Sequence, residues 1–388
     1  MEEKLIIKNF GPINSVELSL RRVNILIGDQ GTGKSTVAKV LDILKAGANS
    51  VSGELHLFDQ KGSKGEIEKS RFKNQEFSKI FFELLSKYDL KSYLTANSFI
   101  QFENTFCKIV IENFSNIQFE EKKKNGENSP IEKNTNVNYY IPAYREAFIL
   151  LRNNYPAILN AKANLPVILN TFGQHFNNYR ENIKRFNFKN IIGIDYNYAN
   201  GRDLIILKNG KEISFEEASS AVNSVVPLLV VFLGVIDYMS GEGTRVYSNH
   251  ICPFVTIEEP ELNCFPSTQN ELIKFLVEKI KFKDYEKSKE YYCNLLLTTH
   301  SPYILTTLNN LMYGYNLGEN NSDDANRIIP QKNWLNPKDV SAYILTTKGL
   351  CENIMDEELK QIKVEKIDEI SEILSEQWHE LANLNFDK

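Results

Sequence analysis

One eight-residue stretch near the start of the chain constrains the fold more than any other part of the sequence. Residues 28–35 read Gly-Asp-Gln-Gly-Thr-Gly-Lys-Ser, a full match to the phosphate-binding loop G-x-x-x-x-G-K-[ST]. An apolar run at residues 23–27 precedes the loop, and residues 36–45 follow it with a helical pattern. A strand, a glycine-rich turn and a helix in this order direct backbone N–H groups at an anion. The sequence therefore predicts a nucleotide site in an α/β fold.

The positions of this loop have separate expected roles. Gly28, Gly31 and Gly33 let the backbone approach a phosphate closely, because they lack a Cβ. Lys34 is expected to reach the β- and γ-phosphates and Ser35 to hold Mg²⁺. The predicted cofactors are ATP and Mg²⁺, since the guanine-reading pattern N-K-x-D is absent. The other residues expected to line the nucleotide are Gln30, Thr32 and Thr36.

Two further polar positions follow apolar strands later in the chain. Glu258 and Glu259 end the apolar run 254–257, where one acid can meet Mg²⁺ through its shell and a second can polarise the attacking water. Acidic pairs are also common in ordinary turns, but the upstream loop favours the catalytic interpretation. His300 ends a near-continuous apolar strand at 294–299, and that position favours a γ-phosphate sensor over a structural histidine.

The order of a strand hairpin, a phosphate-binding loop, a glutamate pair followed by proline, and Thr-Thr-His-Ser-Pro resembles the ABC-type ATPase heads of the AAA_21/OLD group, which are relatives of SMC and DNA-repair ATPases. The resemblance implies an α/β P-loop NTPase of ABC-ATPase type, with a mixed central sheet, an N-terminal β-rich lobe and helical insertions. It also implies that Glu258 replaces the usual Walker B aspartate as a metal-site acid, that Glu259 is the catalytic base and that His300 is the switch histidine.

The resemblance assigns roles to two more segments. Residues 219–224 stand where the family has its signature motif, so Ser219 and Ser220 are expected to touch the nucleotide of a second subunit. Ala221 replaces the family's glycine, which predicts slow hydrolysis; a plain helix N-cap is the alternative for the two serines. Residues 140–145 are similar to the family's Y-I-P-A-x-R, which places Arg145 either near the phosphates or in a surface ion pair. Phe10 is expected to border the adenine.

We expect one ATPase domain over residues 1–328 and a C-terminal extension over 329–388, which ends in an amphipathic helix around 367–381. Within the domain, the core covers 1–48, 100–145 and 190–328, and helical insertions cover about 60–100 and 146–189. Three local patterns are also informative: an exposed loop at 60–70, a helical stretch at 156–188 and a β meander at 191–213. The second half of 156–188 alternates aromatic and basic residues, which favours a packed amphipathic helix over a nucleic-acid contact.

Composition limits the location and the partners. The five cysteines are an odd number with no C-x-x-C pair, which favours reduced thiols and a cytoplasmic protein. We expect no signal peptide and no membrane span, because the longest apolar run, 225–236, is short and contains Pro227. A net charge of −5 gives no global attraction to nucleic acid, so such a contact is left open and requires a local basic patch.

The leading hypothesis from the sequence is a regulatory ATPase. Two copies, or a higher homo-oligomer, hold Mg·ATP between them and regulate a separate effector protein, a nuclease or other toxin. In size and layout the chain resembles ATPase subunits of bacterial anti-phage systems such as PARIS and Septu. One alternative is an SMC-like DNA-repair or chromosome ATPase, which needs coiled-coil arms or a basic channel. Another is an OLD-type nuclease, for which Asp323 and Asp324 lack the required strand context.

Overall fold

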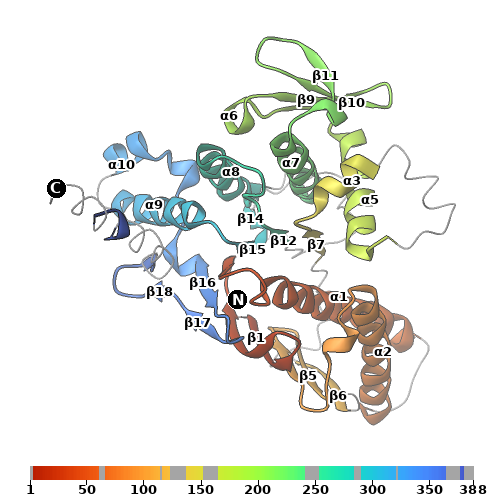
Figure 1. The fold of residues 1–388 in the computed structure, drawn as a ribbon. Coiled ribbons are helices and arrows are strands. Elements are labelled where there is room, and N and C mark those ends of the chain that lie inside the picture. The colour runs from red at the N-terminus through yellow and green to blue at the C-terminus, as the bar shows by residue number, and fades with distance from the viewer. Residues whose placement is uncertain are drawn as a thin grey trace.

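A six-stranded sheet lies at the centre of the molecule (Figure 1). The computed structural model describes residues 3–60, 66–113, 116–122, 137–151, 165–240, 253–283, 290–319, 322–363 and 376–379. Five strands of the sheet run parallel, and the sixth, β17, pairs antiparallel with β16 at one edge. In spatial order they are β17 (Cys351–Asn353), β16 (Val340–Leu345), β3 (Val23–Ile27), β15 (Asn294–Thr299), β12 (Phe254–Glu258) and β7 (Asn138–Ile141).

Both faces of the central sheet are buried, which explains why its strands read as continuous apolar runs. Successive side chains of β3 point to opposite faces, so Ile25 and Ile27 enter one hydrophobic core and Leu26 enters the other. The first core is closed by helices α5 (Val167–Asn182), α7 (Ser220–Ser240), α8 (Pro266–Lys279) and α9 (Pro302–Gly318). The second core lies between the sheet, helix α1 (Lys34–Gln60) and the N-terminal β lobe.

The N-terminal lobe is an antiparallel sheet packed on α1 and α2 (Glu66–Lys87) (Figure 1). The expected hairpin is present, with a turn at Gly11 whose φ of +54° favours glycine. Its strands, in spatial order, are β2 (Ile13–Leu20), β1 (Glu3–Phe10), β4 (Phe99–Glu103), β5 (Cys107–Glu112) and β6 (Asn116–Glu121).

Buried charges join α1 to this lobe. Lys45 pairs with Glu3 and lies 4.2 Å from the centre of the Phe254 ring. On the same helix Asp42 accepts a hydrogen bond from the Tyr88 hydroxyl of the segment after α2. Burial raises the pKa of Asp42 to about 6, although the hydrogen bond from Tyr88 and the charge of Lys45 oppose that rise. Asp42 is therefore an acid whose ionised form is disfavoured in the folded protein.

A small antiparallel sheet lies at the end of the molecule opposite the N-terminal lobe (Figure 1). The expected turn at Asn200 and Gly201 has φ of +52° and +74°, the backbone typical of a tight hairpin. Its strands are β8 (Arg185–Asn187), β9 (Asp195–Ala199), β10 (Arg202–Ile206) and β11 (Glu212–Ser214). Helix α6 (Lys189–Ile192) connects β8 to β9, and helix α3 (Arg145–Leu151) follows β7 in the chain. The remaining elements are α10 (Ser322–Ile328) and the hairpins β13 (Lys281–Lys283) with β14 (Glu290–Tyr292) and β18 (Met355–Asp356) with β19 (Gln361–Ile362).

Several local expectations are corrected by the structure. Residues 66–70, expected in an exposed loop, form the first turns of α2. The helix expected to reach residue 188 ends at Asn182, because residues 185–187 pair with β9. Helix α7, with 21 residues, is long and apolar enough to cross a membrane, but 78% of its apolar window is buried inside the protein, as in a core helix. Most of the helix expected around 367–381 lies outside the described residues.

The segment expected as a C-terminal extension contributes β16 to the central sheet, in parallel register with β3. Asn24 explains part of this pairing. It is fully buried, accepts a hydrogen bond from the Ser341 hydroxyl at 2.7 Å and donates one to the Leu295 carbonyl at 3.0 Å. One polar side chain of β3 thus contacts both neighbouring strands.

Candidate nucleotide site

The phosphate-binding loop lies at the carboxyl end of β3, where strand β15 and β16 also end. Gly28, Gly31 and Gly33 all have positive φ, of +148°, +78° and +99°. A Cβ on Gly28 would lie 2.2 Å from the Leu345 carbonyl oxygen of β16, so only glycine fits there. The Thr32 hydroxyl donates to the Asp29 carbonyl at 2.9 Å and closes the loop. Gln30 and Ser35 are exposed at its surface, and Thr36 is buried beneath it.

Lys34 is drawn back over its own loop. Its ammonium donates to the carbonyl oxygens of Gly28 at 2.7 Å and Asp29 at 2.8 Å. Burial lowers the pKa of Lys34, and the nearby carboxylates of Glu259, Asp29 and Glu261 oppose that decrease. Three carboxylates close to one ammonium form a site that favours a cation at neutral pH.

The structure brings three of the expected site residues into one chain of contacts. Lys34 Nζ lies 3.5 Å from His300 Nδ1, and His300 Nε2 lies 3.4 Å from a Glu259 carboxylate oxygen. Because the ammonium can only donate, the neutral imidazole with its proton on Nε2 satisfies both contacts. His300 and Glu259 are each about one-third exposed, so this edge of the site is open to solvent.

Glu258 points inward, away from that open edge. It is 2% exposed, and its two oxygens accept hydrogen bonds from the Tyr140 hydroxyl at 2.7 Å and the Ala143 N–H at 3.1 Å. Burial and the adjacent Glu258 charge raise the pKa of Tyr140 well above 10, so the phenol stays protonated and donates. A carboxylate in this position has lone pairs left for a water shell but is not itself at the surface.

These donors fit a magnesium site of the P-loop type. Ser35 offers an exposed hydroxyl, and the buried Glu258 could act on a bound ion through an intervening water shell. When bound, Mg²⁺ would neutralise charge on the phosphate oxygens.

The structure excludes one of the two positions expected for Arg145. The Arg145 side chain is fully buried, which rules out a surface ion pair, and its guanidinium donates to backbone carbonyls. Burial lowers its pKa to about 10, so it remains a cation at neutral pH. The acceptors are the carbonyl oxygens of Ser224 at 2.8 Å, Glu258 at 2.8 Å, Glu259 at 3.0 Å and Pro142 at 3.1 Å.

Ser219 and Ser220 are exposed at the start of α7. Ser219 Oγ accepts a long hydrogen bond from the Val222 N–H, 3.4 Å, which is the geometry of a helix N-cap. Among the hydrogen bonds of the described residues, none joins either serine to the loop of the same chain. Their expected contact with the nucleotide of a second subunit stays a prediction.

Glu261 is a site residue that was not expected from the sequence. Its carboxylate accepts hydrogen bonds from the Thr299 hydroxyl at 2.8 Å and from the His300 N–H at 2.7 Å, and so fixes the backbone that carries the histidine. An acid two residues beyond the glutamate pair was the available signal, but its partner lies about 40 residues away in sequence. Only the pairing of β12 with β15 brings the two together.

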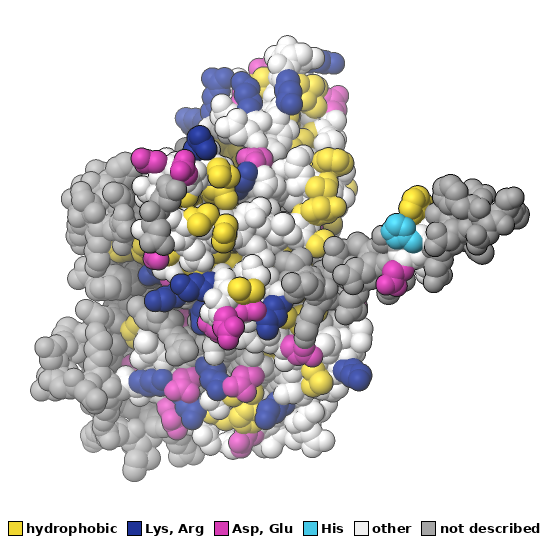
Figure 2. All heavy atoms as spheres, turned by 90° about the vertical axis from the view of Figure 1, so that its left-hand side faces the viewer, with side chains coloured by type: hydrophobic (Ala, Val, Ile, Leu, Met, Phe, Trp, Pro, Cys, Tyr) yellow, Lys and Arg dark blue, Asp and Glu magenta, His cyan; other side chains and the backbone are white. Residues whose placement is uncertain are grey.

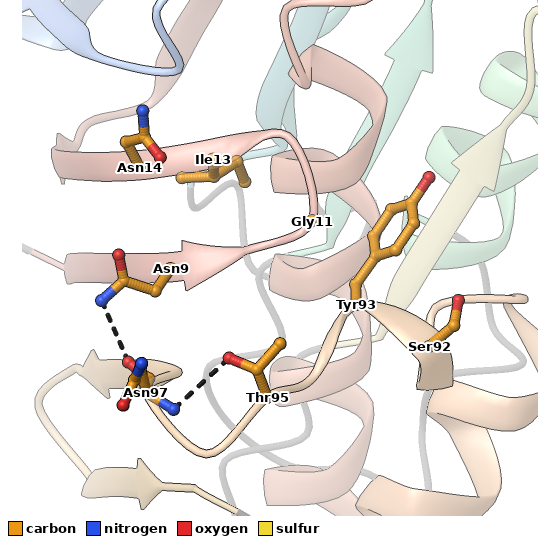
Figure 3. Close-up of a pocket in the computed structure, with 8 residues that line it drawn as sticks. All are labelled: Asn9, Gly11, Ile13, Asn14, Ser92, Tyr93, Thr95 and Asn97. Atoms are coloured by element: carbon orange, nitrogen blue, oxygen red, sulfur yellow. Dashed lines mark hydrogen bonds between the residues drawn. The ribbon is translucent and has the colours of Figure 1, made fainter.

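A surface pocket of about 400 Å³ adjoins the loop (Figure 3). It lies between the β1–β2 turn and the 3₁₀ segment Lys91–Tyr93 with the residues that follow it. Ile13, one of its wall residues, would lie 3.2 Å from a Cβ on Gly33 of the loop. Phe10 was expected to border the adenine, but it is fully buried and meets the edge of Tyr93 instead, with ring centres 5.9 Å apart. The lining residues are Asn9, Gly11, Ile13, Asn14, Ser92, Tyr93, Thr95 and Asn97.

The fold and the site define a P-loop ATPase. The sequence profile of the AAA_15 family, described as an AAA ATPase domain, matches residues 1–224, more than half of the chain, and the chain therefore belongs to this family. No curated protein matches the chain.

Solved structures with a similar fold include the SMC head domain from Thermotoga maritima, at 10% identity and a TM-score of 0.38, covering 79% of this chain and 91% of that one. An SMC head bound to the C-terminal domain of ScpA, derived from Pyrococcus furiosus, is 10% identical with a TM-score of 0.40 and coverage of 96% and 99%. The recombination mediator protein RecF is 9% identical with a TM-score of 0.39 and coverage of 91% and 98%. These likenesses are of fold alone.

Proposed function

We propose that this ATPase holds Mg·ATP on the loop 28–35 and hydrolyses it with Glu259 as the general base. The observation that carries the proposal is the contact chain from Lys34 through His300 to Glu259 at one sheet edge. A cation for the phosphates, a sensor of the terminal phosphate and a carboxylate that can accept a proton from water are the side chains that this reaction needs.

In this proposal the pocket next to the loop accepts the adenine. Tyr93 offers an aromatic surface there, while Asn9 and Asn97 offer amide groups that can pair with the base edge. The pocket would then hold the adenine, the loop would hold the phosphates, and the turn at Glu259 would face the attacking water.

We further propose that nucleotide closes two copies of the chain on each other and that the cycle regulates a separate effector in bacterial anti-phage defence. The exposed Ser219 and Ser220 support the first part, since they face solvent instead of their own loop. Within the described ranges, no group of three or more His, Cys, Asp and Glu side chains could hold a metal ion, which supports an effector on another polypeptide. The defence role rests on the resemblance to PARIS and Septu subunits.

The experiment that tests the site compares wild type with Lys34→Ala by calorimetry and by phosphate release. Wild type should bind ATP and turn it over, whereas Lys34→Ala should do neither, because the loop loses its only side-chain cation. Near-normal ATP affinity in the variant would reject the site assignment.

The oligomer and the effector need separate tests. Light scattering of Glu259→Gln should show twice the monomer mass, or more, with ATP and a lower mass without it. Cells carrying the native gene neighbourhood should resist phage, and Lys34→Ala should remove that resistance. The purified chain alone should cleave neither DNA nor RNA; cleavage that a point change in this chain removes would contradict a separate effector.

A second candidate is an ATPase that acts on DNA, and one surface favours it. The small sheet β8–β11 carries exposed basic side chains, and Figure 2 shows Lys and Arg gathered at that end of the molecule. Binding of a DNA duplex that weakens steeply with salt, and that is lost when these residues are changed, would support this candidate. The exposed basic residues are Lys184, Arg185, Arg202, Lys208 and Lys211.

A further inference from the structure

We infer that Arg145 is a positioning residue that holds the catalytic turn at Glu259 in shape and ties it to the start of helix α7. The inference rests on the proposed role of Glu259 as the base. In this view the buried Arg145 side chain connects the first turn of α7, which begins at the exposed Ser219 and Ser220, to Glu259.

The first observation is the backbone of Glu259 itself. Its φ is +44°, in the left-handed region that residues other than glycine seldom adopt. The following residue, Pro260, restricts the backbone of Glu259 further. Such a conformation persists only when surrounding groups fix it.

Arg145 supplies that fixation. Its guanidinium donates to the Glu258 carbonyl at 2.8 Å and to the Glu259 carbonyl at 3.0 Å, the two carbonyls on either side of the left-handed residue. A planar guanidinium holds its N–H groups at fixed angles, so it sets the relative orientation of two peptide planes. The Glu259 N–H is fixed as well, by a 2.8 Å hydrogen bond to the Thr298 carbonyl.

The second observation is the other end of the side chain. Arg145 Nε donates to the carbonyl of Ser224 in α7, at 2.8 Å. Pro227 lies one turn further along this helix, where it lacks the backbone N–H that other residues donate. The buried side-chain oxygens of Asn223 and Ser224 have no hydrogen-bond partner among the described residues. Arg145 is therefore a specific polar tie between the catalytic turn and the first turns of α7.

A further hydrogen bond joins α3 to the same loop. Glu146, the next residue of α3, accepts a hydrogen bond from the Asn263 side chain in the loop after the catalytic turn. Two adjacent residues of α3 thus hold the same loop. A shift at the start of α7 would therefore reach the Glu259 backbone through these hydrogen bonds.

The test separates turnover from nucleotide binding. Arg145→Lys keeps the charge but cannot span both carbonyls and Ser224, so kcat should fall at least about tenfold while the Kd for ATP changes by less than about threefold. The matched control is Arg180→Lys, which alters a partly buried arginine paired with Asp203 of the small sheet. It should lower the thermal midpoint without changing kcat.

Three results would overturn the inference: wild-type kcat in Arg145→Lys, equal losses of kcat and ATP affinity, or the same fall of kcat in Arg180→Lys. Should Arg145→Lys fail to fold, Glu146→Ala decides: a lower kcat at unchanged Kd supports the inference and an unchanged kcat rejects it. Glu259→Gln is measured alongside. If that variant hydrolyses ATP normally, the proposed function fails and not only the role of Arg145.

Discussion

Glu261, which anchors the backbone of His300, gives the most quantitative prediction. Glu261 accepts hydrogen bonds from Thr299 at 2.8 Å and from the His300 N–H at 2.7 Å, and its other oxygen is buried without a partner among the described residues. In Glu261→Ala both donors lose a charged acceptor. The Thr299 hydroxyl can rotate to another partner, but the His300 N–H cannot.

The expected cost follows from these two bonds. Leaving one part-buried donor unsatisfied costs about 1–3 kcal/mol, so Glu261→Ala should lose about 2–4 kcal/mol of unfolding free energy when the second bond is included. Because His300 links Lys34 to Glu259, a displaced imidazole should also lower kcat by at least about tenfold. Urea unfolding and phosphate release measure the two effects.

The control for this prediction is Glu261→Gln. The amide keeps one oxygen as the acceptor for both donors, and its nitrogen replaces the oxygen that has no partner. We therefore expect a smaller loss of stability and of kcat than in Glu261→Ala. An alanine variant with wild-type kcat, or a glutamine variant as slow as alanine, would refute the reasoning that Glu261 acts by orienting His300.

Two further predictions concern the pocket and α1. Tyr93→Ala should weaken ATP binding about tenfold but leave the binding of inorganic tripolyphosphate unchanged, because only the adenine stacks on the Tyr93 ring. Calorimetry measures both affinities. Equal losses of affinity for the two ligands would contradict the assignment of this pocket to the adenine. The folded-state pKa of Asp42 is about 6 and the unfolded value near 4, so the folded chain binds more protons between these pH values and its stability falls as pH rises through that window. Asp42→Asn should remove this dependence and be more stable than wild type at pH 8 by up to about 3 kcal/mol; parallel stability–pH curves from urea unfolding would contradict the assignment.

Most residues of the candidate site can be predicted from the sequence because they lie in recognisable local patterns. The loop motif lies between an apolar strand and a helix. Glu258 ends an apolar strand, and Glu259 and His300 each follow one; both strands are apolar because both of their faces are buried. Parallel strands place their carboxyl ends at one edge of the sheet, which is why motifs more than 200 residues apart meet.

The sequence could not predict features that depend on tertiary contacts of individual side chains. Arg145 follows strand β7 and is the first residue of α3, but the direction of its side chain is decided by four carbonyls, one of them in α7. Strand β16 was missed because its Ser341 interrupts the apolar pattern, and that serine is satisfied only by Asn24, 317 residues earlier. Helix α2 was missed in part because residues 66–70 are polar.

The most direct test of the account is a single-turnover measurement on Glu259→Gln. The variant should bind ATP with wild-type affinity and hydrolyse it at least about a hundredfold more slowly, because the amide can orient a water molecule but cannot accept its proton. Hydrolysis by Glu259→Gln at the wild-type rate would contradict the claim that the contact chain of Lys34, His300 and Glu259 is the catalytic centre.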